Sequence, residues 1–91
     1  MNEVERQFEA RGVQRGGLLF FSRETALEMI DACQGAGIRL LGIDGFYLGR
    51  TSTQPSMEHS RTFSQAEDAH AAARAFLLSQ TEPLWFEVVC G

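Results

Sequence analysis

Residues 25–48 read TALEMIDACQGAGIRLLGIDGFYL, and this stretch decides the fold because a helix pattern, a stop and a strand pattern follow one another in it. Ala26, Ile30 and Cys33 recur at spacings of three and four residues, which predicts an amphipathic helix with acidic residues mostly on its other face. The apolar segment 38–43 that follows is typical of a strand. We therefore expect a helix that packs on a sheet.

The ends of this helix carry their own signals. Ser22 is a typical N-cap residue, and Glu24 follows it in the first turn, where the helix dipole favours an acid. Gly35 or Gly37 is placed to end the helix in the left-handed conformation.

A hairpin is predicted after the strand. Asp44-Gly45 is a dipeptide favoured in tight turns, which makes 46–48 the returning strand. Asp44 there either bonds the backbone of its own turn or presents an acid at the hairpin tip. Residues 49–62 are polar and contain Pro55, so they predict a long loop or an edge element that proline interrupts.

The remaining elements lie on either side of this region. The apolar run 18–21 predicts a short strand that is buried on both faces. Ser64 and Glu67 form a capping-box pattern at the start of a second helix through 65–78. The segment 84–89 predicts a last strand, on which one of its two adjacent aromatic residues should face the helices and the other the bare side of the sheet.

These elements follow one another in the order β-α-β-β-α-β. We therefore expect one α+β domain over 17–91, a four-stranded mainly antiparallel sheet with two helices packed on one face. Residues 1–16 are expected to form an N-terminal arm or a short, loosely attached helix, because the Arg/Gly-rich stretch 11–17 breaks any regular pattern.

The charge of the chain is acidic and unevenly spread. Twelve Asp and Glu stand against eight Arg, for a net charge of −4. Segment 1–23 is slightly basic, and 24–91 carries the excess of acids. An acidic body argues against direct nucleic-acid binding and fits a basic protein partner. Plain solubility explains the same charge, so composition alone leaves both interpretations open.

The chain shows no pattern for export or for a membrane. No apolar stretch approaches the roughly 20 residues of a membrane span, and the polar start MNEVERQFEA is unlike a signal peptide. We therefore expect a cytoplasmic protein. In a reducing compartment Cys33 and Cys90 are expected to be free thiols, although the sequence leaves a disulfide open.

Catalytic and metal-binding patterns are weak. Glu58 and His59 stand between Ser56 and Ser60, which suggests a hydrolase. However, adjacent residues on an extended chain point to opposite faces, so Glu58 cannot easily orient His59. The histidines, cysteines and acids follow no metal-ligand spacing. We therefore expect no catalytic residue, no metal and no cofactor.

The segment 49–62 is the part of the chain most typical of a binding element. It is long for so small a domain, and it mixes hydrogen-bond donors with charged and apolar side chains, as interfaces do. The candidate binding residues in and near it are Asp44, Tyr47, Gln54, Met57, Glu58, His59 and Arg61. A second acidic face on the first predicted helix comprises Glu24, Glu28 and Asp31, for which ordinary solvation is the competing explanation.

Two segments resemble bacterial immunity proteins. The helix and strand of 25–48, which end in GIDG at 42–45 and two aromatic residues, are similar to the opening unit of the immunity family of E-five type colicins. The segment 53–60, TQPSMEHS, resembles a predicted immunity family found beside polymorphic toxins. The likeness covers about half of the chain, and it departs from the colicin family in 1–16 and 49–62.

The resemblance implies an antidote that binds a toxin domain and blocks its active site. In the colicin family that domain is a nuclease acting on tRNA anticodons, and an acidic inhibitor suits a cleft built for phosphates. The implied contacts here are Asp44, Tyr47 and Glu58. We keep two alternatives: a small enzyme or ligand-binding domain that uses 49–62 with His59, and a homodimeric structural module formed through the sheet face or an edge strand.

Overall fold

The helix predicted within 25–48 forms, and the strand predicted after it forms but extends further than predicted. The computed structural model describes residues 2–63 and 66–91. Helix α2 (Arg23–Ala36) begins where the Ser22 hydroxyl accepts the Thr25 backbone N–H at 3.3 Å. It ends at Gly37, whose φ of 69° is the left-handed conformation that glycine adopts without cost. Strand β3 (Leu40–Leu48) follows directly.

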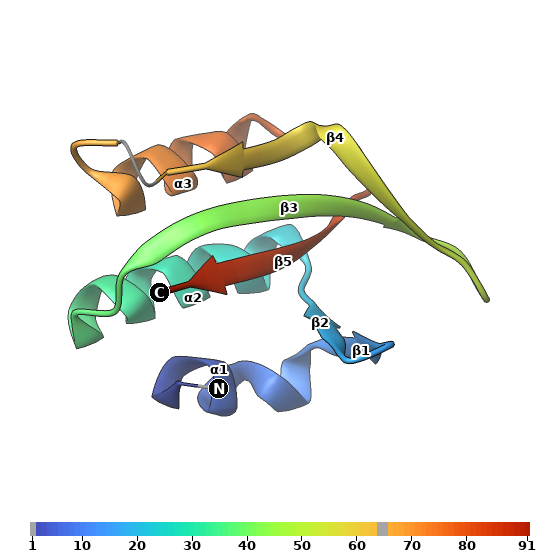
Figure 1. Ribbon diagram of the computed structural model, residues 1–91, viewed down its shortest axis with the longest axis horizontal. Coiled ribbons are helices and arrows are strands. Elements are labelled where there is room, and N and C mark those ends of the chain that lie inside the picture. Colours follow the sequence, from blue (N-terminus) through green and yellow to red (C-terminus); the bar gives the residue numbers. More distant parts are fainter. Residues whose placement is uncertain (1, 64–65) are drawn as a thin grey trace.

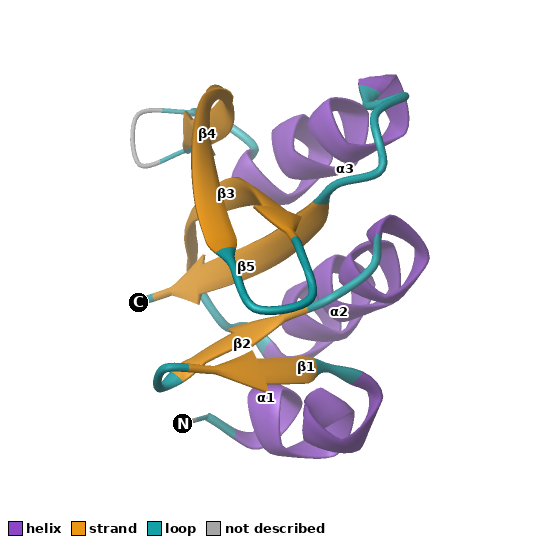
Figure 2. Ribbon diagram, turned by 90° about the vertical axis from the view of Figure 1, so that its right-hand side faces the viewer, coloured by secondary structure: helices purple, strands orange, loops and turns teal. Residues whose placement is uncertain are grey.

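Strand β3 is the centre of a three-stranded antiparallel sheet. Its neighbours are β4 (Thr53–Thr62) on one side and β5 (Trp85–Cys90) on the other (Figure 1). Helices α2 and α3 (Ala69–Ser79) lie together against one face of this sheet (Figure 2). The core forms between these two layers, and its fully buried side chains include Met29, Ile30, Cys33, Ile43, Leu77 and Phe86.

The prediction of a four-stranded sheet with two helices is wrong. The described residues form three α-helices and five strands in two separate sheets. Strand β2 (Leu18–Phe20) pairs with β1 (Val13–Arg15) through a tight turn, and only Phe21 bridges to Phe86 of β5. The physical reason is competition for partners: residues 18–20, which would extend the pairing along β5, pair with β1 instead, and Ser22 after the bridge already caps α2.

The turn between β1 and β2 contains a signal that the sequence interpretation missed. Gly16 and Gly17 both have positive φ, 54° and 83°, as a two-residue hairpin turn requires. Two adjacent glycines therefore fold this segment back on itself rather than merely breaking its regularity. The Arg15 guanidinium then donates to the carbonyls of Gly49 and Ser52, at 2.6 and 2.8 Å, and ties the small hairpin to the turn between β3 and β4.

The predicted hairpin turn at Asp44-Gly45 is also wrong. Both residues lie inside β3, and the chain reverses at 49–52 instead. Gly45 sits there because β4 approaches it closely: a Cβ at this position would lie 2.6 Å from the backbone oxygen of His59. The edge-element alternative for 49–62 is correct for 53–62, which is an edge strand, but Pro55 pairs with Phe46 inside this strand and does not interrupt it.

The N-terminal segment is docked on the domain. Helix α1 (Glu3–Phe8) places Val4 and Phe8 in the main core, and a short 3-10 turn, η1 (Glu9–Arg11), leads on to β1. The Arg11 guanidinium lies over the Phe8 ring, 5.2 Å from its centroid. Val4 and Phe8 therefore share one side of a helix that packs against α2.

The second predicted helix starts later than its pattern suggested. Asp68 is the N-cap of α3, and its carboxylate accepts the Ala71 backbone N–H at 3.0 Å. Ser64, half of the predicted capping box, lies outside the described residues. The last strand forms as predicted: Phe86 is buried under the helices, and Trp85 pairs with Phe46 on the other side of the sheet.

Candidate functional site

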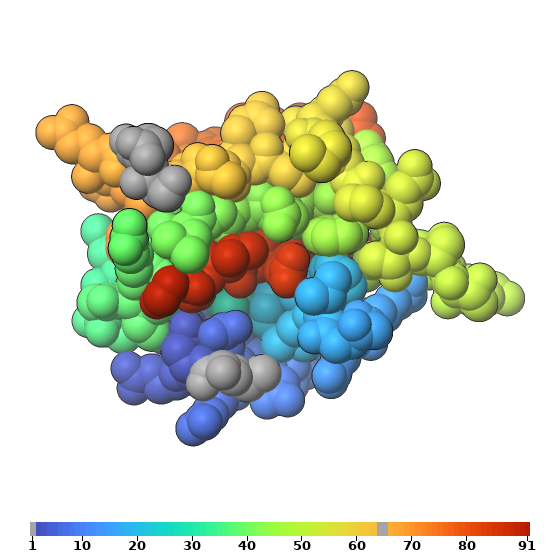
Figure 3. All heavy atoms as spheres, in the orientation of Figure 1, coloured from blue at the N-terminus to red at the C-terminus, as the bar shows by residue number. Residues whose placement is uncertain are grey.

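One face of the three-stranded sheet carries no helix. Figures 1 and 3 view the molecule from this side, where residues of β3 and β5 lie between β4 and α1. At one end of this side of the sheet Phe46 lies opposite Trp85 and packs against Phe20 of β2. We call the neighbouring part of this side the open face; the strand register gives its residues as Gly42, Asp44, Ser60, Thr62, Glu87 and Val89. The two acids among them lie directly opposite each other on β3 and β5.

Asp44 and Glu87 form a like-charged cross-strand pair. Both side chains are half-buried, and partial burial together with the Asp44 charge raises the pKa of Glu87 above its ordinary value. Like charges in directly opposed positions destabilise a sheet. Within the described residues no arginine forms an ion pair with either acid, so their repulsion is not compensated inside the molecule.

This pair predicts a measurable pH dependence of stability. Because the native pKa of Glu87 is raised, its ionisation costs stability; the cost is absent below the ordinary value of 4.5 and grows as the pH rises through the native pKa. Glu87→Gln should remove that decline and raise the free energy of unfolding at pH 7 by about 0.5 kcal/mol. Urea unfolding from pH 4 to 8 measures it, with Glu9→Gln on η1 as control. The prediction would be wrong if Glu87→Gln lost as much stability between pH 4 and pH 8 as the natural protein does, or if it were less stable than the natural protein at pH 7.

Strand β4 contains a three-residue bulge next to the open face. Ser60 pairs with Asp44 and Ser56 pairs with Gly45, so the three residues at 57–59 have no partner on β3. The Ser60 hydroxyl closes the base of the bulge: it donates to the Ser56 carbonyl at 2.8 Å and accepts the Gly45 N–H at 3.3 Å. Bulges of this kind re-aim side chains and often occur beside functional sites.

The bulge presents an apolar side chain beside an acid. Met57 is 83% exposed, the largest exposure among the exposed large hydrophobic residues. It lines a shallow hollow of about 360 Å³ together with Asp44, Ser60, Arg61 and Thr62. An exposed methionine in an otherwise polar rim is the kind of contact that a protein partner can bury.

The predicted binding residues therefore separate into two groups. Asp44, Met57 and Arg61 line the hollow on the open face. Tyr47 and His59 lie together on the other side of the β4 bulge, with ring centroids 6.2 Å apart. The register places Gln54 beside Tyr47.

Arg61 and Glu58 connect this second group to the helix layer. The Arg61 guanidinium lies 5.3 Å from the centroid of the Phe76 ring on α3, and it donates to the carbonyls of Glu58 and Ser60. The Tyr47 hydroxyl donates to Glu82 at 3.4 Å, and desolvation followed by the Glu82 charge raises the pKa of Tyr47. Tyr47 is thus held in an acidic environment.

Ser56 and His59 form a polar pair that the sequence interpretation did not find. The Ser56 Oγ and the His59 Nδ1 lie 2.7 Å apart, because the bulge brings residues i and i+3 onto the same side. Within the part of the chain that the structure describes, no carboxylate hydrogen-bonds His59, so the third member of a catalytic triad is missing.

The acids of the helix layer differ from those of the open face because arginines pair with them. Glu28 binds Arg11 at 2.5 Å, which lowers the pKa of Glu28, and Asp31 binds Arg74 at 2.6 Å. Glu24 lies 3.4 Å from Arg23. The predicted second acidic face is therefore largely neutralised by arginines of the same chain.

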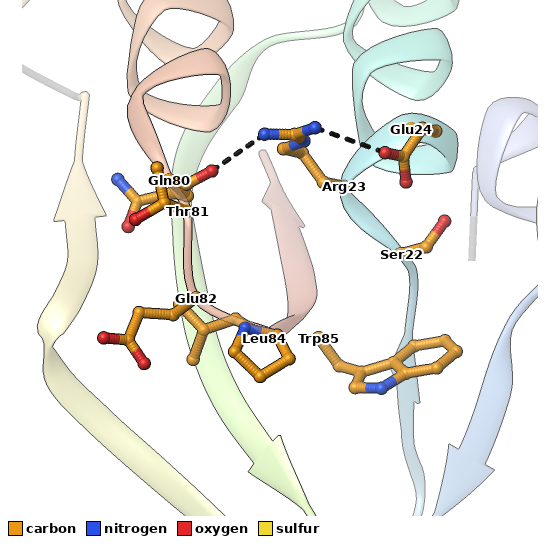
Figure 4. Close-up of a pocket in the computed structure, with 9 residues that line it drawn as sticks. Ser22, Arg23, Glu24, Gln80, Thr81, Glu82, Leu84 and Trp85 are labelled. Carbon is orange, nitrogen blue, oxygen red and sulfur yellow. Dashed lines mark hydrogen bonds and ion pairs between the residues drawn. The ribbon is translucent and has the colours of Figure 1, made fainter.

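A separate hollow lies where the start of α2 meets the chain before β5. Its volume is about 370 Å³, and Figure 4 shows Arg23 extending across it between Gln80 and Glu24. Arg23 donates to the Gln80 carbonyl at 2.8 Å and pairs with Glu24. Since these two groups already occupy the guanidinium, we do not assign this hollow an anion-binding role.

Two further findings concern ligands and membranes. Across the described residues, no three His, Cys, Asp or Glu side chains gather closely enough to hold a metal ion. None of the helices in residues 2–63 and 66–91 combines the length and apolar character needed to span a bilayer.

Together the fold and the site define a two-layer α+β protein with an uncompensated acidic sheet face and a bulged edge strand. Comparison with protein-family models, curated proteins and solved structures finds no match to this chain. The function must therefore be inferred from the site itself.

Of the two acids on the open face, sequence reasoning missed Glu87. Its signal was available, because Trp85 and Glu87 are two residues apart on a strand and so share a face. What the sequence did not show is that Asp44 lies opposite it, since Asp44 was expected in a turn.

Proposed function

We propose that this protein is an immunity protein that binds a basic toxin domain, a nuclease acting on RNA, and blocks its active site. It binds through the open face and the adjacent bulge of β4. It performs no reaction and requires no cofactor, and it acts in the cytoplasm of the cell that it protects. The resemblance of 25–48 and 53–60 to immunity proteins supports the toxin as partner.

The observation that carries the proposal is the contrast between the two acidic surfaces. The acids of α2 are paired with arginines, whereas Asp44 and Glu87 repel each other without an arginine partner in the described residues. A cationic partner would relieve that repulsion and gain a charge-assisted contact at the same time. The open face is therefore the acidic surface on which a basic partner gains the most.

The shape of the surface supports a protein partner over a small ligand. The hollow beside Asp44 is shallow, and exposed Met57 stands at its rim. A nuclease cleft is lined with arginine and lysine to hold phosphates. Paired carboxylates beside an apolar anchor can occupy such a cleft in place of the nucleic acid, and opposite charges speed the encounter.

The first test is binding to the product of the neighbouring gene. We expect stable co-elution of the two proteins and rescue of cells that express the toxin. The double variant Asp44→Asn/Glu87→Gln should weaken binding at least about tenfold and reduce its dependence on salt. The matched control is Glu24→Gln, which removes one charge from the helix layer and should change affinity less than about twofold. Equal losses in the two variants would reject the open face as the binding surface.

The Ser56–His59 pair favours one alternative, a small hydrolase. This alternative predicts that His59→Ala abolishes an activity without unfolding the protein, and that the open-face double variant retains it. The homodimer alternative predicts a dimeric mass that falls on dilution. An activity that His59→Ala leaves unchanged would exclude this hydrolase, and a monomeric mass at all concentrations would exclude the homodimer.

A further inference from the structure

Two cysteines that are distant in sequence meet at the end of the molecule where β5 finishes. Cys33 of α2 and Cys90 of β5 lie with their sulfur atoms 4.0 Å apart, and both are thiols. A disulfide bond needs the sulfurs at about 2.05 Å. Rotation of the two side chains must therefore bring the sulfur atoms closer before a bond can form.

The two thiols differ in environment. Cys33 is fully buried beneath the sheet, whereas Cys90 is half-exposed near the C-terminal end of the strand. The hydrogen bond from Cys33, with a smaller contribution from Asn2, lowers the pKa of Cys90 to about 7. The same contact and burial raise the pKa of Cys33. At neutral pH the thiolate therefore forms on Cys90, the residue of the pair that is partly exposed, and thiolates are the reactive form.

We infer that Cys33 and Cys90 form a reversible dithiol–disulfide site, in which Cys90 reacts first with an oxidant and Cys33 resolves the product. With glutathione disulfide, the Cys90 thiolate attacks one sulfur, and a glutathione thiolate leaves. The Cys33 thiol then loses its proton and attacks the Cys90 sulfur, which expels the attached glutathione as a second thiolate. The protein loses two electrons and two protons, and the glutathione disulfide becomes two glutathione thiols.

The location of the pair gives the bond a structural consequence. It would join the third turn of α2 to the end of β5, across 57 positions of sequence. A cross-link over so long a segment restricts the unfolded chain strongly. The oxidised protein should therefore be the more stable form, and a reducing compartment keeps the pair open.

The test uses the full-length protein and glutathione disulfide at neutral pH. We expect the intact mass to fall by two hydrogens, a linked peptide containing Cys33 and Cys90, and a melting temperature higher by at least roughly 10 °C. Dithiothreitol should reverse all three changes. Cys33→Ala, which keeps a small apolar side chain in the core, should stop at a stable glutathione adduct on Cys90.

The control is Cys90→Ser, in which buried Cys33 should not react while the protein is folded. Two results would overturn the inference: a lasting glutathione adduct on Cys90 of the natural protein with no internal bond, or no reaction of either thiol without denaturant. Circular dichroism of both variants establishes that they are folded, so that a failure to react reports on the sulfur pair.

Discussion

Gly45→Ala is expected to lower the free energy of unfolding by about 2–3 kcal/mol. A methyl group at this position would lie 2.6 Å from the His59 backbone oxygen and 2.9 Å from its Cβ. Neither atom belongs to a flexible side-chain end, so β4 itself must move away from β3. That movement would also break the Gly45–Ser60 hydrogen bond at the base of the bulge. Urea unfolding of the purified variant measures the loss.

The matched control for this prediction is Gly35→Ala. Gly35 lies within α2, and a Cβ built there meets no atom within 4 Å. Alanine is the better helix former, so this change should stabilise the protein by up to about 1 kcal/mol. If neither alanine variant changes the free energy of unfolding, β4 does not approach Gly45 of β3 as closely as described.

The Gly45 variant also tests the proposed binding surface. The bulge positions Met57 next to Asp44, and its displacement should weaken toxin binding more than the loss of stability explains. Binding measured well below the melting temperature, with the Gly35 variant alongside, separates the two effects. Unchanged affinity in the Gly45 variant would show that the bulge contributes nothing to the interface.

Phe8→Ala should destabilise the protein by about 3–4 kcal/mol, the largest effect of a single side chain predicted here. Phe8 is only 6% exposed and belongs to the main core, although it lies on a six-residue helix near the chain end. The substitution removes a buried ring and also the surface on which Arg11 lies. A domain of this size has about 5–10 kcal/mol of stability, so the variant should fold but melt well below the natural protein.

Gln7→Ala is the control for this prediction, because Gln7 is exposed on the same helix. It should change stability by less than about 0.5 kcal/mol. The two variants together decide whether residues 1–11 are part of the folding unit. Equal stability of Phe8→Ala and Gln7→Ala in thermal and urea unfolding would show that α1 is not docked in solution.

Local signals identified the helices and strands where the information was contained in a few neighbouring residues. Ser22 and Gly37 marked the two ends of α2, and the apolar segment 84–89 indicated β5. The interpretation was wrong at Asp44-Gly45, because the same dipeptide suits a turn and a strand that another strand approaches closely. Which of the two occurs depends on the approach of His59 and Ser60 of β4, and Ser60 lies 15 positions from Gly45 in the chain.

The sequence by itself determined an acidic α+β domain, the places of α2 and β5 and the residue types around the β4 bulge. Only the tertiary structure decided that β2 leaves the main sheet, that α1 joins the core, and that Asp44 meets Glu87 while the acids of α2 meet arginines. The physical reason is that caps, turns and periodicity act over a few residues, whereas strand pairing and ion pairing depend on which distant segments share space. The candidate site arises from the second kind of interaction, so its members were visible in the sequence but their arrangement was not.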